Sequence, residues 1–225
     1  MKRSLTMGIC LVLFLACIGV ASANLVSNGG FETPVVTDPK GWQLYGDSAP
    51  GLDWHVERGV GAPDTWPPQL ELQNVNAIQL QPYKGEQFAE LDSEYNVIIY
   101  QIIPVTEGKI YKISFAQACR SDGGENPSLL GVYWGDTYLG QTSCSETMTW
   151  LTHSYSPTAP SGGEVKVMFV DEGASNSYGV LLDAVEIAEE EDNIPVPEFP
   201  TMALPAAFIV GMLGVVLFIQ RTKEN

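Results

Sequence analysis

Residues 24–188 consist of short alternating or β-branched segments separated by Gly, Pro, Asn, Asp and Ser, without a long stretch of helical period. This pattern limits the fold more than any other feature of the sequence, because it predicts strands and no long helix. We predict ten strands, at 41–45, 53–57, 70–73, 87–92, 96–105, 109–118, 129–135, 149–156, 164–170 and 178–188. Ten short strands in one segment are typical of an all-β sandwich or jelly roll.

Alternation within the strands predicts which side chains are buried. Along 109–118, three large side chains share one face and are expected to form part of the core, namely Tyr111, Ile113 and Phe115. The segment "VTEGK" at 105–109 supplies a Gly-containing turn, which predicts a hairpin over 96–118. The Pro- and Gly-rich segment 58–68 is predicted to be a long surface loop that carries Trp66.

The first 23 residues have the three parts of an export signal. Two basic residues follow Met1, the segment 7–20 is apolar and predicts a signal helix, and Ala-Ser-Ala at 21–23 is an A-x-A cleavage site. The mature chain is therefore expected to begin at Asn24. A lipid-modified Cys17 is the alternative, but the cleavage site lies just downstream of it.

The C-terminal end carries a second apolar segment. Residues 201–219 contain no charge and have about the length that spans a bilayer as a transmembrane helix. The basic residues Arg221 and Lys223 follow, so the positive-inside rule places the end of the chain in the cytoplasm and 24–200 outside. Between domain and helix, "EEEDNIPVPEFP" at 189–200 predicts an extended acidic, Pro-rich stalk.

The exported segment is strongly acidic. Residues 24–200 hold seven basic and 26 acidic side chains, a formal net charge of −19. Such a surface repels a phosphate backbone, so nucleic acid is not an expected partner. About 165 residues give room for one domain with its own core, at 24–188.

Removal of the signal leaves two cysteines, Cys119 and Cys144. Export places them in an oxidising compartment, where a disulfide is the expected outcome. Two buried free thiols are one alternative. A metal site is the other, but His55 and His153 are the only histidines available to complete it.

Seven sequence blocks follow one another in a fixed order along the predicted domain. They are "NLVSNGGFETP" (24–34), "KGWQLY" (40–45), "LELQN" (70–74), "GEQFAELDS" (85–93), "YQIIPVTEGKIYKISFAQACR" (100–120), "GVYWGD" (131–136) and "YGVLLDAVEI" (178–187). This ordered set resembles the galactose-binding-domain-like jelly rolls, which include the CenC-type carbohydrate-binding modules. The resemblance covers nearly all of 24–188 and implies an all-β jelly-roll sandwich that binds a ligand, often a polysaccharide.

The end of the chain, 197–225, resembles the PEF-CTERM sorting signal. The motif residues are Pro197, Glu198, Phe199 and Pro200, followed by the apolar segment and the basic end. The resemblance implies recognition by an archaeosortase-type transpeptidase, which cuts the tail and transfers the protein to another anchor. A permanent single-span membrane anchor is the alternative, and both place the domain at the cell surface.

The fold resemblance also implies a structural calcium ion between the first and last strands. The matching positions are Glu32 in "NGGFE" and Asp183 in "LLDAV". Calcium takes hard oxygen ligands such as carboxylates and backbone carbonyls. The alternative is that Glu32 hydrogen-bonds a turn while Asp183 satisfies buried backbone amides.

Sugar rings stack on aromatic side chains, and their hydroxyls bind carboxylates, amides and Arg. The residues with this chemistry that we select as candidates for sugar binding are Trp66, Glu71, Glu90, Asp92, Arg120 and Trp134. Packing in the core is the alternative for each tryptophan, and solvation is the alternative for the acids. No G-x-S-x-G, H-E-x-x-H or P-loop motif occurs, so we do not expect an enzyme.

The sequence thus predicts an exported cell-surface protein whose domain binds an extracellular polysaccharide or surface-layer glycan. A structural protein of the envelope or extracellular matrix, with no free-sugar ligand, is the alternative.

Overall fold

The structure, a computed structural model, describes residues 23–120, 128–144 and 148–190. The chain divides into two compact units, Met1–Glu190 and Glu191–Asn225. Residues 1–22 of the predicted signal, most of the stalk, and the sorting tail with its predicted transmembrane helix lie outside the described residues. Within the described ranges, no helix is long and apolar enough to cross a membrane.

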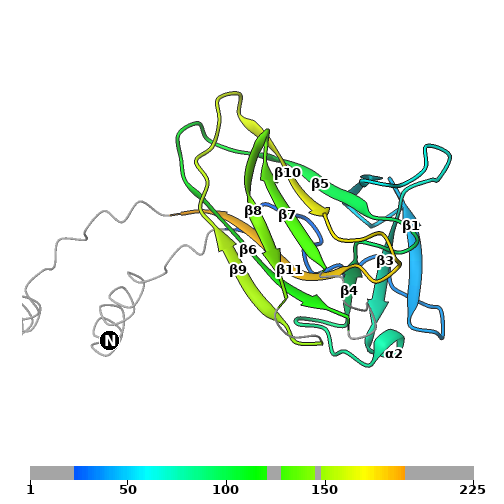
Figure 1. The fold of residues 1–225 in the computed structure, drawn as a ribbon. Coiled ribbons are helices and arrows are strands. Elements are labelled where there is room, and N and C mark those ends of the chain that lie inside the picture. The colour runs from blue at the N-terminus through cyan, green and yellow to red at the C-terminus, as the bar shows by residue number, and fades with distance from the viewer. Residues whose placement is uncertain (1–22, 121–127, 145–147, 191–225) are drawn as a thin grey trace, which may run out of the picture. The chain divides into compact units, whose positions relative to one another are not determined.

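The described residues form an all-β sandwich of two antiparallel sheets (Figure 1). The six-stranded sheet has the order β1-β3-β4-β11-β6-β9, and the five-stranded sheet has the order β2-β5-β10-β7-β8. The strands are β1 (Trp42–Gly46), β2 (His55–Arg58), β3 (Gln69–Asn74), β4 (Gln87–Glu90), β5 (Val97–Pro104), β6 (Tyr111–Cys119), β7 (Leu129–Trp134), β8 (Thr137–Ser143), β9 (Leu151–Tyr155), β10 (Glu164–Asp171) and β11 (Val180–Glu189), and a short helix, α2 (Val75–Ile78), follows β3.

The core lies between the sheets and follows the alternation of the strands. The predicted core residues Tyr111, Ile113 and Phe115 are all buried, with at most 2 % of their surface exposed. Strand β10 contributes Phe169 from the other sheet, whose ring meets Phe115 edge to face at 5.3 Å between centroids. The start of the domain pairs with its end, because the Leu25 amide donates to the Ile187 carbonyl at 2.8 Å.

Two details of the strand prediction differ from the structure. The predicted hairpin over 96–118 is wrong: β5 pairs with β2 and β10, whereas β6 pairs with β9 and β11. The turn between them instead carries the chain from one sheet to the other, which lets Val105 and Tyr111 both enter the core. The second difference is β8, an exposed edge strand whose few large apolar side chains gave no strand signal.

The predicted disulfide is confirmed, with Cys119 bonded to Cys144 across a sequence separation of 25 residues. Cys119 is the last residue of β6 and Cys144 directly follows β8, so the bond joins the two sheets.

Reduction of this disulfide is expected to lower the free energy of unfolding by about 3 kcal/mol, because the reduced unfolded chain gains loop entropy. Denaturant unfolding with and without a thiol reductant measures the loss. The Cys119→Ser/Cys144→Ser variant should match the reduced protein and show no response to reductant. Equal stability of the oxidised and reduced chains would contradict the prediction.

Candidate functional site

Two acidic side chains meet on the outer face of the six-stranded sheet. In β3, Leu70 and Leu72 point into the core, which turns Glu71 outward. In β4 the same alternation turns Glu90 outward, and the register places Glu71 directly opposite Glu90. Like charges at directly opposite positions destabilise a sheet unless other groups compensate them.

Hydrogen bonds from Gln73, Arg120 and the Gly179 amide compensate these two carboxylates. We call the side chains of Glu71, Gln73, Glu90 and Arg120 the carboxylate cluster. The Gln73 Nε2 donates to Glu71 Oε1 at 2.7 Å and also to Glu90 Oε2. The Arg120 Nη1 donates to both oxygens of Glu90, at 3.2 and 3.1 Å, and the Gly179 amide donates to Glu90 Oε1 at 2.9 Å. The structure therefore brings three of the sugar-site candidates into one hydrogen-bonded group.

Burial sets the electrostatics of the cluster. Glu90 is 1 % exposed, and desolvation raises its pKa to about 8 against the lowering effect of Arg120. Desolvation also raises the pKa of Glu71, while Gln73 and Arg120 oppose the shift. Near neutral pH the two carboxyl groups therefore tend to hold one proton between them, which makes the cluster both a donor and an acceptor of hydrogen bonds.

Aromatic side chains border the cluster. Trp42 of β1 lies directly opposite Gln73 in the register and is half-buried. The ring of Tyr178, also half-buried, packs under the Arg120 guanidinium at 4.7 Å. Among the described residues, the buried Gln73 Oε1 has no hydrogen-bond donor. The Gln73 side chain is itself 1 % exposed.

The other half of this face is apolar. A small buried cluster is packed by half-buried Trp150 and consists of Leu80, Phe88, Ala118 and Leu181. Trp150 meets Phe88 edge to face at 5.6 Å and donates its Nε1 to the Gln81 carbonyl at 2.8 Å. Tyr83, half exposed, lies beyond it at 6.3 Å from the Trp150 ring. The outer face of the six-stranded sheet thus combines polar and aromatic groups.

Both tryptophans selected from the sequence are buried, so neither presents a free face for stacking. Trp66 is 8 % exposed, donates its Nε1 to Glu94 at 2.9 Å and packs edge to face on Tyr95 at 5.3 Å. Trp134 is 4 % exposed, donates to the Thr158 carbonyl at 3.0 Å and packs on Tyr111. The structure corrects both assignments: these rings belong to the core.

Asp92 is also corrected, because its carboxylate is fully buried and supports a loop. Its Oδ2 accepts the amides of Asn176 and Ser177 at 2.7 and 2.9 Å, which fixes the segment that precedes β11. Burial raises the pKa of Asp92 against these hydrogen bonds. A ligand on the surface has no path to this group.

Glu32 and Asp183, the predicted calcium ligands, lie close together at the end of the sandwich where the chain begins. Glu32 lines a hollow of about 310 Å³ together with Asn24, Gly30, Lys84, Gly85, Ala184, Val185 and Glu186. Asp183 lies behind this lining, with its Oδ1 3.9 Å from the position that a Cβ on Gly30 would take. Glu32 Oε1 accepts the Glu86 amide at 2.9 Å, and Asp183 Oδ2 accepts the Lys84 amide at 3.0 Å. Both alternatives raised from the sequence, hydrogen bonding to a turn and to backbone amides, are therefore present.

Two observations fit a cation at this position, and a third does not. Desolvation raises the pKa of Asp183 to about 7, and the Glu32 charge adds to the rise. Gly85 has a φ of +75°, and a Cβ there would lie 2.0 Å from Glu32 Oε1, so the backbone closely approaches the carboxylate. Within the described ranges no three His, Cys, Asp or Glu side chains converge on one point, so backbone carbonyls and water would complete the coordination.

Three residues of the candidate site were not found from the sequence: Trp42, Gln73 and Tyr178. A signal existed for Gln73, because it has the same parity as Glu71 along β3. Trp42 becomes a neighbour only through the pairing of β1 with β3, which the sequence does not reveal.

The domain is an all-β sandwich of two antiparallel sheets, and its fold is similar to those of solved carbohydrate-binding modules. It is similar to TmCBM61, solved in complex with β-1,4-galactotriose, with a TM-score of 0.50 and 16% identity over 75% of this chain and 100% of that chain. It is also similar to family 16 carbohydrate binding module-2, with a TM-score of 0.45 and 17% identity over 74% of this chain and 100% of that one.

The end of the chain is defined by sequence. Residues 196–223 match the family described as the PEF-CTERM archaeal protein sorting domain, and the predicted motif Pro197–Pro200 lies within the match. The chain therefore carries a PEF-CTERM sorting domain, which indicates export and attachment at the cell surface. No curated protein matches the chain.

Proposed function

We propose that the domain binds an extracellular carbohydrate on the outer face of the six-stranded sheet, without catalysis. The observation that carries the proposal is the half-buried Trp42 beside a carboxylate cluster in which the Gln73 Oε1 lacks a donor. An aromatic face next to carboxylates, an amide and Arg is the arrangement that sugar rings require. The sandwich fold, which is similar to those of carbohydrate-binding modules, supports a carbohydrate-binding role but does not identify the sugar.

Binding without catalysis follows from how the acids are held. Glycoside hydrolysis needs two carboxyl groups with room for the glycosidic bond between them. Here Gln73 bridges Glu71 and Glu90, and Arg120 and Gly179 occupy the oxygens of Glu90. These contacts favour recognition of hydroxyl groups over attack on a sugar carbon.

The proposed route to the surface uses both ends of the chain. The signal at 1–23 directs export, the transmembrane helix at 201–219 holds the tail in the membrane, and an archaeosortase-type transpeptidase exchanges that tail for another anchor. The mass of the mature C-terminus separates this route from permanent anchoring, because cleavage removes the residues that follow the motif.

A calcium ion between Glu32 and Asp183 is the proposed structural cofactor. Those two carboxylates would hold it, and the close approach of Gly85 would bring backbone toward it. The ion would compensate the charges of Glu32 and the desolvated Asp183 and would tie the first residues of the domain to β11.

Trp42→Ala is expected to weaken carbohydrate binding by about tenfold or more, since loss of an aromatic anchor typically has this effect. The measurement uses the full-length chain in a detergent without a sugar headgroup. Isothermal titration with oligosaccharides of galactan, xylan, mannan and β-glucan gives the affinities.

The control is Val60→Ala, which shortens a side chain that is 77% exposed on a loop away from the cluster and should leave the affinity unchanged. If Trp42→Ala binds as well as the parent while its melting temperature is preserved, the proposed site is wrong. If the parent binds no oligosaccharide and associates instead with surface-layer preparations, the structural envelope protein is the better description.

A further inference from the structure

The sandwich has four edge strands, and three of them carry a feature that hinders pairing with another strand. An open edge is a template for a further strand, so folded proteins protect their edges with charges, bulges or covering segments. In β2 the Val56 amide donates to Asp47 Oδ1 at 3.0 Å. The segment 35–37 lies along β1, where the Thr37 amide donates to Gln43 Oε1 at 3.4 Å. The pairing of β8 with β7 shifts register at a bulge.

The fourth edge, β9 (Leu151–Tyr155), has none of these features. Its five residues pair with β6 in regular register and include no proline, Asp, Glu, Lys or Arg. Within the described ranges, β6 is the only strand that pairs with β9. None of the five residues is fully buried. The edge of β9 is therefore available to a further strand.

The surroundings of β9 are uncharged on a strongly acidic domain. Residues 137–144 and 148–163 contain no Asp, Glu, Lys or Arg, although 24–200 carry a formal net charge of −19. The first range includes β8, which lies beside β9, since a Cβ on Gly140 would be 3.1 Å from the Tyr155 hydroxyl (Figure 1). Desolvation lowers the pKa of His153, so this side chain is neutral at physiological pH. Two copies of the domain can therefore meet along this side without bringing acidic groups together.

We propose that β9 pairs with β9 of a second copy of the chain, antiparallel and centred on His153, so that two six-stranded sheets join into one of twelve strands. The sequence of β9 is complementary to itself in this register. Leu151 lies opposite Tyr155 twice on the inner face, and Thr152 lies opposite Ser154 twice on the outer face. Apolar–aromatic pairs and pairs of hydroxyl side chains both stabilise directly opposed strands.

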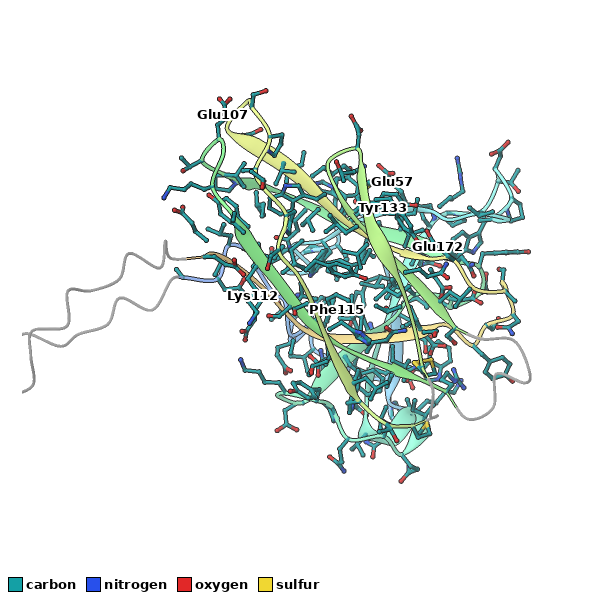
Figure 2. The ribbon with its side chains drawn as sticks, turned by 60° about the vertical axis from the view of Figure 1, so that its left-hand side comes forward. Glu57, Glu107, Lys112, Phe115, Tyr133 and Glu172 are labelled. Atoms are coloured by element: carbon teal, nitrogen blue, oxygen red, sulfur yellow. A yellow bond between two sulfur atoms is a disulfide. The ribbon has the colours of Figure 1, made fainter. Side chains whose placement is uncertain are left out.

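This pairing also covers apolar surface at the rim of the core. Leu151, His153 and Tyr155 are each half-buried. The rings of His153 and Tyr155 stack on Phe115, which is labelled in Figure 2, at 5.5 and 6.4 Å between centroids. Contact with the same three residues of a second copy removes more of their surface from water, which favours association.

Charged groups near β9 stay apart in this dimer. Lys112 of β6, labelled in Figure 2, is one strand further from the axis, so three gaps of about 4.8 Å each separate its strand from the same strand of the second copy. Glu190 accepts the Ser156 hydroxyl at 2.7 Å, just beyond β9. Ser156 lies opposite Trp150 of the second copy, so roughly 20 Å of strand separates the two Ser156 positions. Both separations exceed the Debye length of about 8 Å at physiological ionic strength, so like charges do not oppose the pairing.

The geometry of the dimer has a consequence for the carboxylate cluster. An antiparallel pair centred on one residue has its two-fold axis perpendicular to the sheet, so the outer faces of both six-stranded sheets lie on the same side. The two proposed carbohydrate sites then face one polysaccharide together, which raises the affinity through effective concentration. The dimer itself depends on β9 alone and does not require that the domain binds a glycan.

The register is tested by mixing two full-length variants in detergent, Thr152→Cys and Ser154→Cys. Directly opposite residues of an antiparallel pair have Cα atoms about 5 Å apart, which is within the range of a disulfide. Mild oxidation of the mixture should therefore give a covalent dimer. Either variant alone should give far less, because its two introduced thiols belong to Cα atoms more than about 7 Å apart. Equal cross-linking of the mixture and of the single variants, or none in any of them, would overturn the proposal.

Sedimentation equilibrium in a density-matched detergent measures the affinity of the dimer. Thr152→Lys/Ser154→Lys places like charges directly opposite each other twice and should weaken association at least about tenfold. The matched control is Val35→Lys/Val60→Lys, which adds the same charge at positions that are 64% and 77% exposed and should leave the dimer unchanged. A monomeric parent, or a dimer that both double variants affect equally, contradicts pairing through β9. Loss of oligosaccharide binding in Trp42→Ala with an intact dimer bears only on the carbohydrate site.

Discussion

Arg120→Met is expected to reduce the free energy of unfolding by roughly 3 to 5 kcal/mol at pH 8.5, because it leaves the Glu90 carboxylate buried without its charged partner. Glu90 is 1 % exposed and lies opposite Glu71, so its carboxylate has little access to solvent that could take the place of the guanidinium. Denaturant unfolding at fixed pH measures the loss. For a domain of this size it corresponds to a fall in melting temperature of about 10 °C.

The effect should depend on pH with a definite sign. The pKa of Glu90 is raised from 4.5 to about 8 in the folded state, so folding favours the protonated form. The stability linked to this group is complete below pH 4.5 and is lost as the pH rises through about 8. The parent should therefore become more stable on acidification from pH 8.5 to pH 5. The loss caused by Arg120→Met should be about 1 kcal/mol smaller at pH 5, where Glu90 is neutral in both proteins.

Two further variants test this reasoning. Glu90→Gln removes the buried charge, so it should flatten the pH dependence, and in the double variant it should recover most of the loss caused by Arg120→Met at pH 8.5. Lys112→Met removes one positive charge from an exposed position of β6, the strand that Arg120 directly follows, and should change stability by less than about 0.5 kcal/mol. An Arg120→Met loss that is equal at pH 5 and pH 8.5 would contradict the account.

The fold was predictable as far as alternation carries the information. Tyr111, Ile113 and Phe115 are in the core because side chains of a strand alternate between faces, and that rule needs no knowledge of neighbours. Which strands share a sheet was not predictable in the same way. The turn at 105–109 has the same composition whether it closes a hairpin or crosses between sheets, so the error at 96–118 came from long-range pairing.

The candidate site was also predictable from alternation only in part, because its geometry depends on long-range strand pairing. Parity along β3 and β4 is enough to place Glu71 and Glu90 outside the core, but only the register brings them opposite each other. Trp134 could have been excluded, since it shares parity with Leu130 and Val132, which are fully buried. Trp66 could not, because its burial depends on the distant Glu94 and Tyr95.

Removal of calcium is expected to have an effect of similar size. If free calcium is about 1,000 times its dissociation constant, binding to the folded state adds about 4 kcal/mol, so EDTA should lower the melting temperature by about 10 °C. The physical reason is that the Glu32 charge opposes ionisation of the desolvated Asp183, and the ion removes this repulsion. Thermal unfolding of the full-length chain at pH 7.5, in calcium and in EDTA, measures the difference.

Asp183→Asn should melt at nearly the same temperature in calcium and in EDTA, whereas Asp136→Asn, the same change at an exposed turn, should keep the full response. The response should also shrink in acid. Because the pKa of Asp183 is raised to about 7 in the folded state without metal, the stability linked to it returns as the pH falls below 7, and protonation then competes with calcium. An EDTA effect of the same size at pH 5 and pH 7.5 would place the ion away from Asp183. No effect at either pH would show that Glu32 and Asp183 hold the turn and β11 together through backbone amides alone.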